Sequence, residues 1–211
     1  MQQVHSKGLI HRDLKPSNCI ILDTSPPSVK LVDFGLACTV HGEYMTAEEQ
    51  DGAGTPAYQA PEVLKKEACG LPSDVYSFGI IVWELLSGRI PYEGISLEEM
   101  KSAVIAGKRL PVRPTWNRDL VMMMISCWEP EGQRRPTFSA LIARISALIA
   151  EVVSPMLLWW MQPDLLAGTS IGANAVNWSS LMDALVPMTI MAGHVGSTTN
   201  GGGVLGNMEE L

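Results

Sequence analysis

The chain reads His-Arg-Asp-Leu-Lys-Pro-Ser-Asn over residues 11–18 and Asp-Phe-Gly over residues 33–35. A third run, Gly-Thr-Pro-Ala-Tyr-Gln-Ala-Pro-Glu, covers residues 54–62. Alone, each run says little, because an Asp followed by Leu-Lys-Pro is usually a solvated turn. All three occur here in one order and at a defined spacing. The combination therefore decides what the rest of the sequence is expected to be.

These runs resemble the catalytic loop, the metal-binding loop and the segment that ends in Ala-Pro-Glu of the protein kinase family. The resemblance covers roughly residues 4–150 and implies the large, C-terminal lobe of a protein kinase, mainly α-helical with a small β-hairpin. We expect the small lobe to be absent. No glycine-rich loop followed by a Val-Ala-x-Lys strand precedes the catalytic loop, and the glycines at 201–203 lie in the wrong place and context.

The patterning around these runs predicts the first elements. Short apolar, β-branched runs at 19–22 and 29–32 flank a proline-rich stretch and predict a hairpin that keeps the first two motifs close together. Residues 36–60 are polar and glycine-rich, and they predict a long surface loop.

Three helices are predicted further along the chain. Residues 74–87 are apolar on nearly every face, which a helix tolerates only when protein surrounds it, so we expect a central helix closed by Gly88. The run Ser-Leu-Glu-Glu at 96–99 is a capping box and starts a surface helix that ends near Gly107. Apolar residues at three- and four-residue spacing over 138–149 predict an amphipathic helix on the core.

Composition predicts one folded domain and a tail. The 211 residues are 46% hydrophobic and 18% charged, which is ordinary for a globular protein. We expect the kinase lobe over 1–152. Residues 153–211 are expected to form a low-complexity, flexible tail, because Gly, Ser, Thr and Asn dominate from 167 onward and supply few apolar anchors.

Charge and cysteine usage limit the partners and the compartment. A net charge of −7 argues against nucleic acid or an anionic membrane as the main partner. No apolar run approaches the length of a membrane span, and the N-terminus has no signal-peptide pattern. The cysteines at 19, 38, 69 and 127 are too far apart for Cys-x-x-Cys chemistry. We expect reduced thiols and a cytoplasmic protein.

The resemblance assigns the residues that would perform phosphoryl transfer from ATP. Asp13 would be the catalytic base for the substrate hydroxyl, and Lys15 would neutralise the transferring phosphate. Asn18 and Asp33 would hold Mg²⁺ through hard oxygen ligands. Ile20 would lie against the adenine. ATP and Mg²⁺ are therefore the expected cofactors, and a protein is the expected substrate.

Specificity is partly readable from the same motifs. The sequence Leu-Lys-Pro-Ser at 14–17 resembles serine/threonine kinases, and Thr55 agrees with this and is expected to help form the catalytic site. A resemblance to tyrosine kinases is instead present at three places: residues 74–79, Trp83-Glu84-Leu85 and Cys127-Trp128. This combination is typical of the tyrosine-kinase-like group of serine/threonine kinases.

The resemblance also implies structural roles for five residues. Glu62 should pair with Arg135 as a buried carboxylate and guanidinium in bidentate geometry. Asp74 should accept backbone N–H bonds from the catalytic loop and brace it. His11 and Phe34 should support the two loops in which they occur.

Regulation is expected at the segment between Asp33 and Glu62. Arg12, beside Asp13, implies control by activation-loop phosphorylation, because a phosphate would give this arginine a strong anionic partner. Thr46 is the expected phosphosite, and an upstream kinase would modify it.

Three interpretations remain open from the sequence. The chain is a large-lobe part of an active serine/threonine kinase and is inactive alone, or a non-catalytic kinase-like binding module. The third is a distant phosphotransferase such as the aminoglycoside kinases, which the segment 55–62 and the helix at Asp74 disfavour. The first is favoured because a binding module has no chemical need to retain Asp13, Lys15 and Asn18 together with Asp33.

Overall fold

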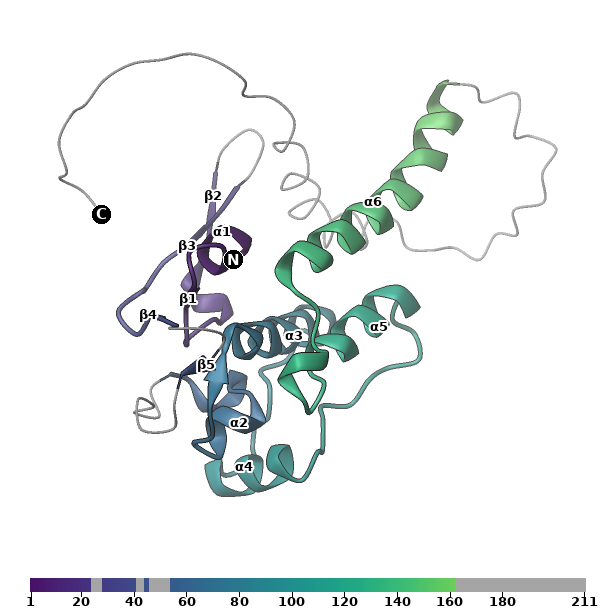
Figure 1. Ribbon diagram of the computed structural model, residues 1–211. Coiled ribbons are helices and arrows are strands. Elements are labelled where there is room, and N and C mark those ends of the chain that lie inside the picture. The colour runs from purple at the N-terminus through teal and green to yellow at the C-terminus, as the bar shows by residue number, and fades with distance from the viewer. Residues whose placement is uncertain (24–27, 41–43, 46–53, 162–211) are drawn as a thin grey trace, which may run out of the picture.

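The computed structural model describes residues 1–23, 28–40, 44–45 and 54–161 (Figure 1). Its helices are α1 Gln2–His5, α2 Pro61–Leu64, α3 Leu71–Ser87, α4 Leu97–Ile105, α5 Arg118–Cys127 and α6 Phe138–Met161. Its strands are β1 Leu9–Ile10, β2 Cys19–Leu22, β3 Ser28–Leu31, β4 Cys38–Thr39, β5 Tyr44–Met45 and β6 Cys69–Gly70. Helices dominate, as expected.

The strands form small antiparallel pairs within the described residues: β1 with β4, β2 with β3, and β5 with β6. The predicted hairpin is the β2–β3 pair, in which Cys19 lies opposite Leu31 and Leu22 opposite Ser28. The backbone N–H of Val32 also donates to the carbonyl of Asn18 at 3.0 Å. The hairpin therefore keeps the end of the catalytic loop beside the start of the Asp-Phe-Gly loop.

The surface loop predicted over 36–60 contains β4 and β5, which the sequence analysis did not foresee. Each of these strands has two residues and exists because it pairs with a distant partner, β1 or β6. A two-residue strand has no readable alternation of its own, since periodicity needs at least four residues to appear. Residues 41–43 and 46–53 of this loop lie outside the described residues.

Helix α3 is the central helix that the apolar run predicted. It begins at Leu71, three residues earlier than expected, with a proline in its first turn, where the missing N–H costs nothing. It ends where Gly88 takes a left-handed φ of 63°. Most of its residues from Ser73 to Trp83 are buried, and in Figure 1 it lies between the hairpin region and helices α2 and α4.

The capping box of α4 is confirmed. The Glu99 N–H donates to Ser96 Oγ at 3.3 Å, and the Ser96 N–H donates to Glu99 Oε2 at 3.2 Å. Helix α5 was not predicted, although Asn117 caps it by accepting the N–H groups of Asp119 and Leu120. Its buried residues Met123, Met124 and Cys127 face α3 and complete the core.

Helix α6 begins where the amphipathic pattern predicted and continues beyond it. Thr137 Oγ1 accepts the N–H of Ala140 at 3.2 Å, which fixes the first turn. The helix runs to Met161, so the domain boundary expected after residue 152 falls inside it. The remainder of the predicted tail, residues 162–211, lies outside the described residues.

The main core surrounds α3 and α5. Its largest fully buried side chains are Tyr76, Leu14, Ile80, Met123, Met124 and Leu141. A second small cluster joins Ile10, Val40 and Cys69 beneath the short strands. Among the helices that the structure describes, none has the length and apolar character needed to cross a membrane.

Candidate catalytic site

Asp13 lies at the centre of a closed set of hydrogen bonds. Its side chain is 7% exposed, and Oδ1 accepts both the N–H and the hydroxyl of Thr55, at 2.8 Å and 2.7 Å. Its other oxygen, Oδ2, lies 2.7 Å from Lys15 Nζ and accepts from Asn18 Nδ2 at 3.2 Å. The structure thus brings Asp13, Lys15, Asn18 and Thr55 together as one constellation.

Lys15 bridges the two other polar groups of this constellation. Its ammonium donates to Thr55 Oγ1 at 2.7 Å while it contacts the Asp13 carboxylate. Its side chain is 24% exposed, so the bridge is reachable from solvent. A cation at this edge can attract a phosphate without leaving Asp13 unpaired, because Thr55 and Asn18 still donate to that carboxylate.

The environment keeps Asp13 ionised. Burial alone would raise the pKa of Asp13, but the hydrogen bonds from Lys15 and Thr55 outweigh it and leave the pKa below its ordinary value. An ionised carboxylate accepts a hydrogen bond from a hydroxyl and can take its proton. The geometry therefore suits a residue that orients and deprotonates a nucleophile.

Asp74 holds the catalytic loop from beneath. It is 1% exposed and accepts the backbone N–H groups of His11, at 2.8 Å, and Arg12, at 3.0 Å. Arg12 takes a left-handed φ of 69°, which is uncommon for a non-glycine residue and needs such support. His5, which the sequence analysis missed, also donates from Nε2 to Asp74, at 2.9 Å.

His11 connects the catalytic loop to the Asp-Phe-Gly loop. Its Nε2 donates to the carbonyl of Val32 at 3.1 Å, which leaves Nδ1 to accept the N–H of Asp13 at 3.4 Å. The His11 ring also contacts the ring of Phe34, with centroids 4.8 Å apart. These contacts fix the backbone on both sides of Asp33.

Asn18 and Asp33 carry oxygen atoms that could bind a hard cation such as Mg²⁺. Asn18 is 6% exposed and uses its Nδ2 on Asp13, so its amide oxygen is the atom left for a cation. Asp33 is exposed and has a left-handed φ of 62°. In the described part of the chain no three His, Cys, Asp or Glu side chains gather. Mg²⁺ often binds proteins through one or two carboxylates and takes its other ligands from phosphate and water, so the oxygen atoms of Asn18 and Asp33 are of the kind that it binds.

Apolar side chains lie exposed beside this set. Ile20 is 45% exposed and Phe34 is 42% exposed, and Ile21 and Leu22 on the same hairpin are also exposed. Exposed aliphatic and aromatic surface of this kind is what a flat, apolar base would cover.

Gly54 allows the segment 54–62 to close over the catalytic loop. Its φ is 107°, and a Cβ built there would lie 2.5 Å from the Arg12 carbonyl oxygen. Only glycine fits this approach. The Thr55 contacts with Asp13 depend on this close approach, a role that the sequence analysis did not assign to Gly54.

Tyr58 anchors the same segment to α3. Its hydroxyl donates to Glu84 Oε2 at 2.6 Å, and the Ser77 hydroxyl donates to the Tyr58 carbonyl at 2.8 Å. Burial and the nearby Glu84 carboxylate both raise the pKa of Tyr58, so it stays protonated and keeps donating. The sequence analysis did not foresee this pair.

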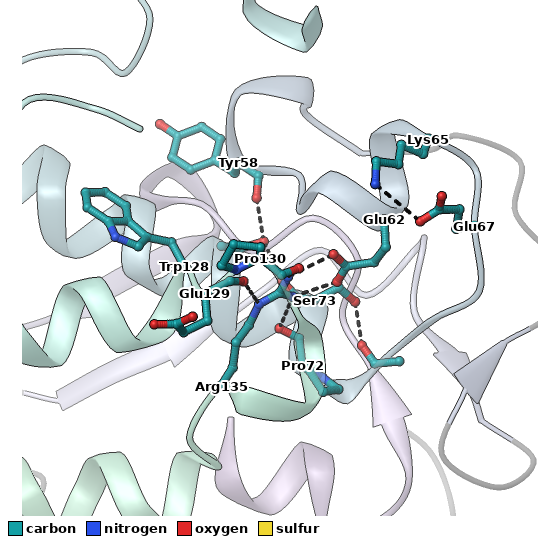
Figure 2. A network of polar contacts seen from close by, with 12 residues as sticks. Tyr58, Glu62, Lys65, Glu67, Pro72, Ser73, Trp128, Glu129, Pro130 and Arg135 are labelled. Carbon is teal, nitrogen blue, oxygen red and sulfur yellow. Dashed lines mark hydrogen bonds and ion pairs between the residues drawn. The ribbon is translucent and has the colours of Figure 1, made fainter. Parts of the chain in front are cut away.

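The expected pair of Glu62 and Arg135 is present and bidentate (Figure 2). Nη1 donates to Oε1 at 2.6 Å and Nη2 to Oε2 at 2.8 Å. The Arg135 side chain is 0% exposed, and it also donates to the carbonyls of Pro72 and Glu129. The pair fastens the end of the segment 54–62 to α3 and to the turn before α6.

The expected phosphosite is not part of this geometry. Thr46 lies outside the described residues, and so does most of the segment around it. Thr39 is exposed on β4, and Arg12 is half-buried in the catalytic loop. The regulatory roles of Arg12 and Thr46 stay predictions.

Comparisons with known proteins agree with this geometry. A family model described as protein tyrosine and serine/threonine kinase matches residues 1–145. Mitogen-activated protein kinase kinase kinase 11 of Homo sapiens is 36% identical over 166 residues, which cover 74% of this chain and 19% of that protein. The probable serine/threonine-protein kinase gdt4 of Dictyostelium discoideum is 37% identical over 155 residues, which cover 69% of this chain and 9% of that protein.

A third relative, mitogen-activated protein kinase kinase kinase 10 of Xenopus laevis, is 34% identical over 158 residues, which cover 70% of this chain and 15% of that protein. The chain therefore spans at most about a fifth of the length of these relatives.

Proposed function

Because the chain belongs to the protein tyrosine and serine/threonine kinase family, we propose that it is a protein serine/threonine kinase and that residues 1–152 are its large lobe. The reaction is transfer of the terminal phosphoryl group of ATP to a serine or threonine hydroxyl of a protein. The observation that carries the proposal is the constellation of Asp13, Lys15 and Thr55, in which the carboxylate, the ammonium and the hydroxyl all lie within hydrogen-bonding distance of one another.

Asp13 and Lys15 have complementary tasks in this mechanism. Asp13 orients the substrate hydroxyl and accepts its proton as the oxygen bonds to phosphorus and the bond from that phosphorus to the leaving oxygen of ATP breaks. Lys15 offsets the negative charge on the transferring phosphoryl group. Thr55 holds both side chains in place through its N–H and hydroxyl.

Asn18 and Asp33 are the residues that would hold Mg²⁺. The ion, when bound, neutralises charge on the phosphates of ATP. Asn18 is fixed for this task by the bonds from its Nδ2 to Asp13, and the loop around Asp33 is fixed by the contacts of His11 with Val32 and Phe34. Ile20 offers an exposed aliphatic surface to the adenine.

Two observations support serine/threonine rather than tyrosine specificity. Lys15 bonds Thr55 directly, so the lysine after the catalytic aspartate and the threonine of the segment 54–62 act as one unit. In addition, the Dictyostelium relative is named a probable serine/threonine-protein kinase.

We expect the 211 residues alone to be nearly inactive. In this family a glycine-rich loop and a strand lysine cover the phosphates and the other face of adenine, and residues 1–10 of this sequence contain neither. Removing one positioned acid–base group typically lowers the rate roughly 10²- to 10⁴-fold. The 211 residues alone lack a larger part of the nucleotide site than one such group. Measurable Mg²⁺-dependent and Asp13-dependent phosphorylation by the purified chain would overturn this expectation.

A fused kinase tests the proposed function. The chain is joined to the residues that precede the matched segment in human mitogen-activated protein kinase kinase kinase 11, and the fusion is incubated with radiolabelled ATP, Mg²⁺ and a mixed protein substrate. Acid hydrolysis then identifies the labelled amino acid. We expect phosphoserine and phosphothreonine, and phosphotyrosine as the main product would contradict the proposed specificity.

Regulation follows from the same proposal. Phosphorylation of Thr46 by an upstream kinase would add a charge of about −1.5 to −2, to which the Arg12 guanidinium could bind. In the fused kinase, Thr46→Ala should lower activity after treatment with an activating kinase. If phosphatase treatment and Thr46→Ala both leave activity unchanged, this regulatory role is wrong.

A further inference from the structure

Residues 100–118, which run from α4 to the first turn of α5, concentrate positive charge in an acidic chain. Five of the chain's 15 Lys and Arg residues lie in this segment, and none of its 22 Asp and Glu residues does. The whole chain, by contrast, has a net charge of −7. We call residues 100–118 the basic segment. Its cations are Lys101, Lys108, Arg109, Arg113 and Arg118.

Four of these cations are available to a ligand. Lys108, Arg113 and Arg118 are exposed, and Lys101 is half-buried. Among the residues that the structure describes, no ion pair joins any of the four to a carboxylate. Their charges are therefore not compensated by the fold itself.

The backbone that carries these cations is held in place. The guanidinium of Arg109, the fifth cation, donates to the carbonyls of Lys108, at 2.9 Å, and Trp128, at 3.0 Å. Trp83 Nε1 donates to the carbonyl of Pro111 at 2.8 Å. A surface whose backbone is already fixed loses less entropy when it binds a partner. The basic segment is thus a preorganised surface.

Arg118 stands where a cation does not help the fold. It is the first residue of α5, at the end of the helix where the dipole is positive and favours an anion. Asp119, the next residue, has the sign that this end prefers. Helix stability therefore does not account for Arg118, whereas a carboxylate bound beside it would be attracted by both the guanidinium and the helix end.

Aliphatic side chains accompany the cations. Ile105 is 40% exposed and lies one helical turn after Lys101, on the same side of α4. Val112 is 39% exposed and precedes Arg113. A partner that carries both carboxylates and aliphatic side chains matches this combination. Nucleic acid offers no aliphatic side chains, and the net charge of −7 opposes an anionic membrane.

The basic segment begins beside the segment that closes the candidate catalytic site. Helix α4 contacts both α2 and the residues 56–58, which belong to or follow from the segment 54–62. In Figure 1 the connection from α4 to α5 then runs along the edge of the helical body. A protein can therefore lie on the basic segment while another part of it reaches Asp13.

We propose that the basic segment is a docking surface for an acidic segment of the protein substrate, in which Asp or Glu residues are interspersed with aliphatic residues. The inference rests on the proposed function and adds which part of the substrate is bound away from its hydroxyl. Single exposed ion pairs bind weakly, so several must act together, and salt must weaken the complex.

A binding experiment without ATP tests the docking surface. Fluorescence anisotropy is measured with the 211-residue chain and a fluorescein-labelled peptide of Glu-Glu-Leu repeats, with a peptide of Ser-Ser-Leu repeats as reference. We expect binding of the acidic peptide alone, weakening as NaCl is raised. No binding of the acidic peptide, or equal binding of the two, would overturn the proposal.

A triple variant locates the surface. Lys108→Gln/Arg113→Gln/Arg118→Gln should weaken binding of the acidic peptide at least roughly threefold, because three exposed ion pairs are lost. The matched control changes the net charge equally at exposed cations elsewhere, and it should keep the affinity: Lys7→Gln/Lys30→Gln/Arg144→Gln.

Equal losses in the two triple variants would overturn the proposal, because net charge rather than the basic segment would then attract the peptide. Tighter binding of the chain to phosphatidylserine vesicles than to the acidic peptide would also overturn it, since the ligand would then be a lipid surface.

The fused kinase shows whether docking serves the reaction. Two peptides share one threonine acceptor sequence and end in Glu-Glu-Leu or Ser-Ser-Leu repeats. We expect a lower KM for the acidic peptide at similar kcat, and the variant at 108, 113 and 118 should remove the difference. Equal KM values in an active fused kinase would overturn docking of the substrate. Phosphorylation of neither peptide would contradict the proposed function, while the binding measurement would still decide the docking surface.

Discussion

At the scale of single residues, the charge on Asp13 depends on two loops that meet in space. Its partners Lys15 and Asn18 are local, whereas Thr55 is 42 positions away and supplies two of the bonds to its carboxylate. Closure of the segment 54–62 on the catalytic loop therefore adds the Thr55 bonds to that of Lys15 in keeping the pKa of Asp13 low. Folding and catalytic competence are linked at this one side chain.

This linkage predicts how acid affects stability. The folded-state pKa of Asp13 lies below its ordinary value, so its contribution to folding is present above about pH 4, the usual pKa of an unfolded Asp, and is lost as the pH falls through the folded-state pKa. Asp13→Asn removes this dependence. In urea unfolding from pH 7 to pH 3, the difference in free energy between the chain and Asp13→Asn should narrow below about pH 4.

If the difference in the free energy of unfolding between the unmodified chain and Asp13→Asn instead widened on acidification, the folded structure would raise the pKa of Asp13. Burial would then outweigh the hydrogen bonds from Lys15 and Thr55. A smaller fraction of Asp13 would be ionised at neutral pH and able to act as a base. His11→Gln, in the same loop, is not a suitable control because the His11 ring also donates to the Val32 carbonyl, and the substitution would disturb that bond.

The sequence predicted the residues of this site better than their supports. Sequence runs with a recognisable spacing contain most of the site: Asp13, Lys15, Thr55, Asp74 and the Glu62–Arg135 pair. His5 and Gly54 were missed for a physical reason. Their roles arise from contacts with Asp74 and with the Arg12 carbonyl that are distant in sequence, so neither the lone His5 nor the position of Gly54 at the start of the run 54–62 reveals them.

At the scale of elements, the contact between α3 and α5 depends on a residue without a side chain. Gly79 lies in the buried part of α3, and a Cβ there would be 2.8 Å from the Cys127 Cβ and 3.3 Å from the Met124 carbonyl oxygen. The two helices can approach this closely only because position 79 is glycine. Intrinsic helix propensity alone would favour alanine.

Gly79→Ala should therefore destabilise the domain in spite of the better helix propensity of alanine. We expect a loss of about 1 to 3 kcal/mol from overpacking, measured by urea unfolding. Leu85→Ala is the control on the same helix, since Leu85 is 66% exposed and its truncation should change stability little. Equal or greater stability of Gly79→Ala would mean that the α3–α5 contact is looser than described.

Elements with local signals were predicted well. Gly88 ends α3, and the Ser96–Glu99 capping box starts α4, because both signals act within one helical turn. The pairs β1–β4 and β5–β6 were not foreseen, since their strands form only against distant partners. The end of α6 at Met161 was also missed, because the amphipathic pattern fades before the helix does.

At the scale of the whole molecule, the Glu62–Arg135 pair joins parts of the chain that are 73 positions apart. It connects the end of the segment 54–62 to the turn before α6, and the carbonyl of Pro72 at the start of α3 accepts from the same guanidinium. The pair therefore fixes how the segment over the catalytic loop sits on the helical body.

Breaking this pair should cost far more than breaking an exposed one. Arg135→Met leaves Glu62 as a poorly solvated, uncompensated charge, and we expect a loss of about 3 to 5 kcal/mol in the free energy of unfolding. Arg134→Ala breaks the Arg134–Glu131 pair, whose side chains are both 67% exposed, and should cost about 0 to 1 kcal/mol. Similar losses in the two variants, measured by urea unfolding, would contradict the structural role of Arg135.

The central claim is that Asp13 orients and deprotonates the substrate hydroxyl, and the kcat of the fused kinase tests it most directly. In the fused kinase, Asp13→Asn should lower kcat by roughly 10²- to 10⁴-fold, because a positioned acid–base group is lost. The KM for ATP should change little, since the variant keeps Asn18, Asp33 and Ile20. A kcat that is unchanged in Asp13→Asn would contradict the account.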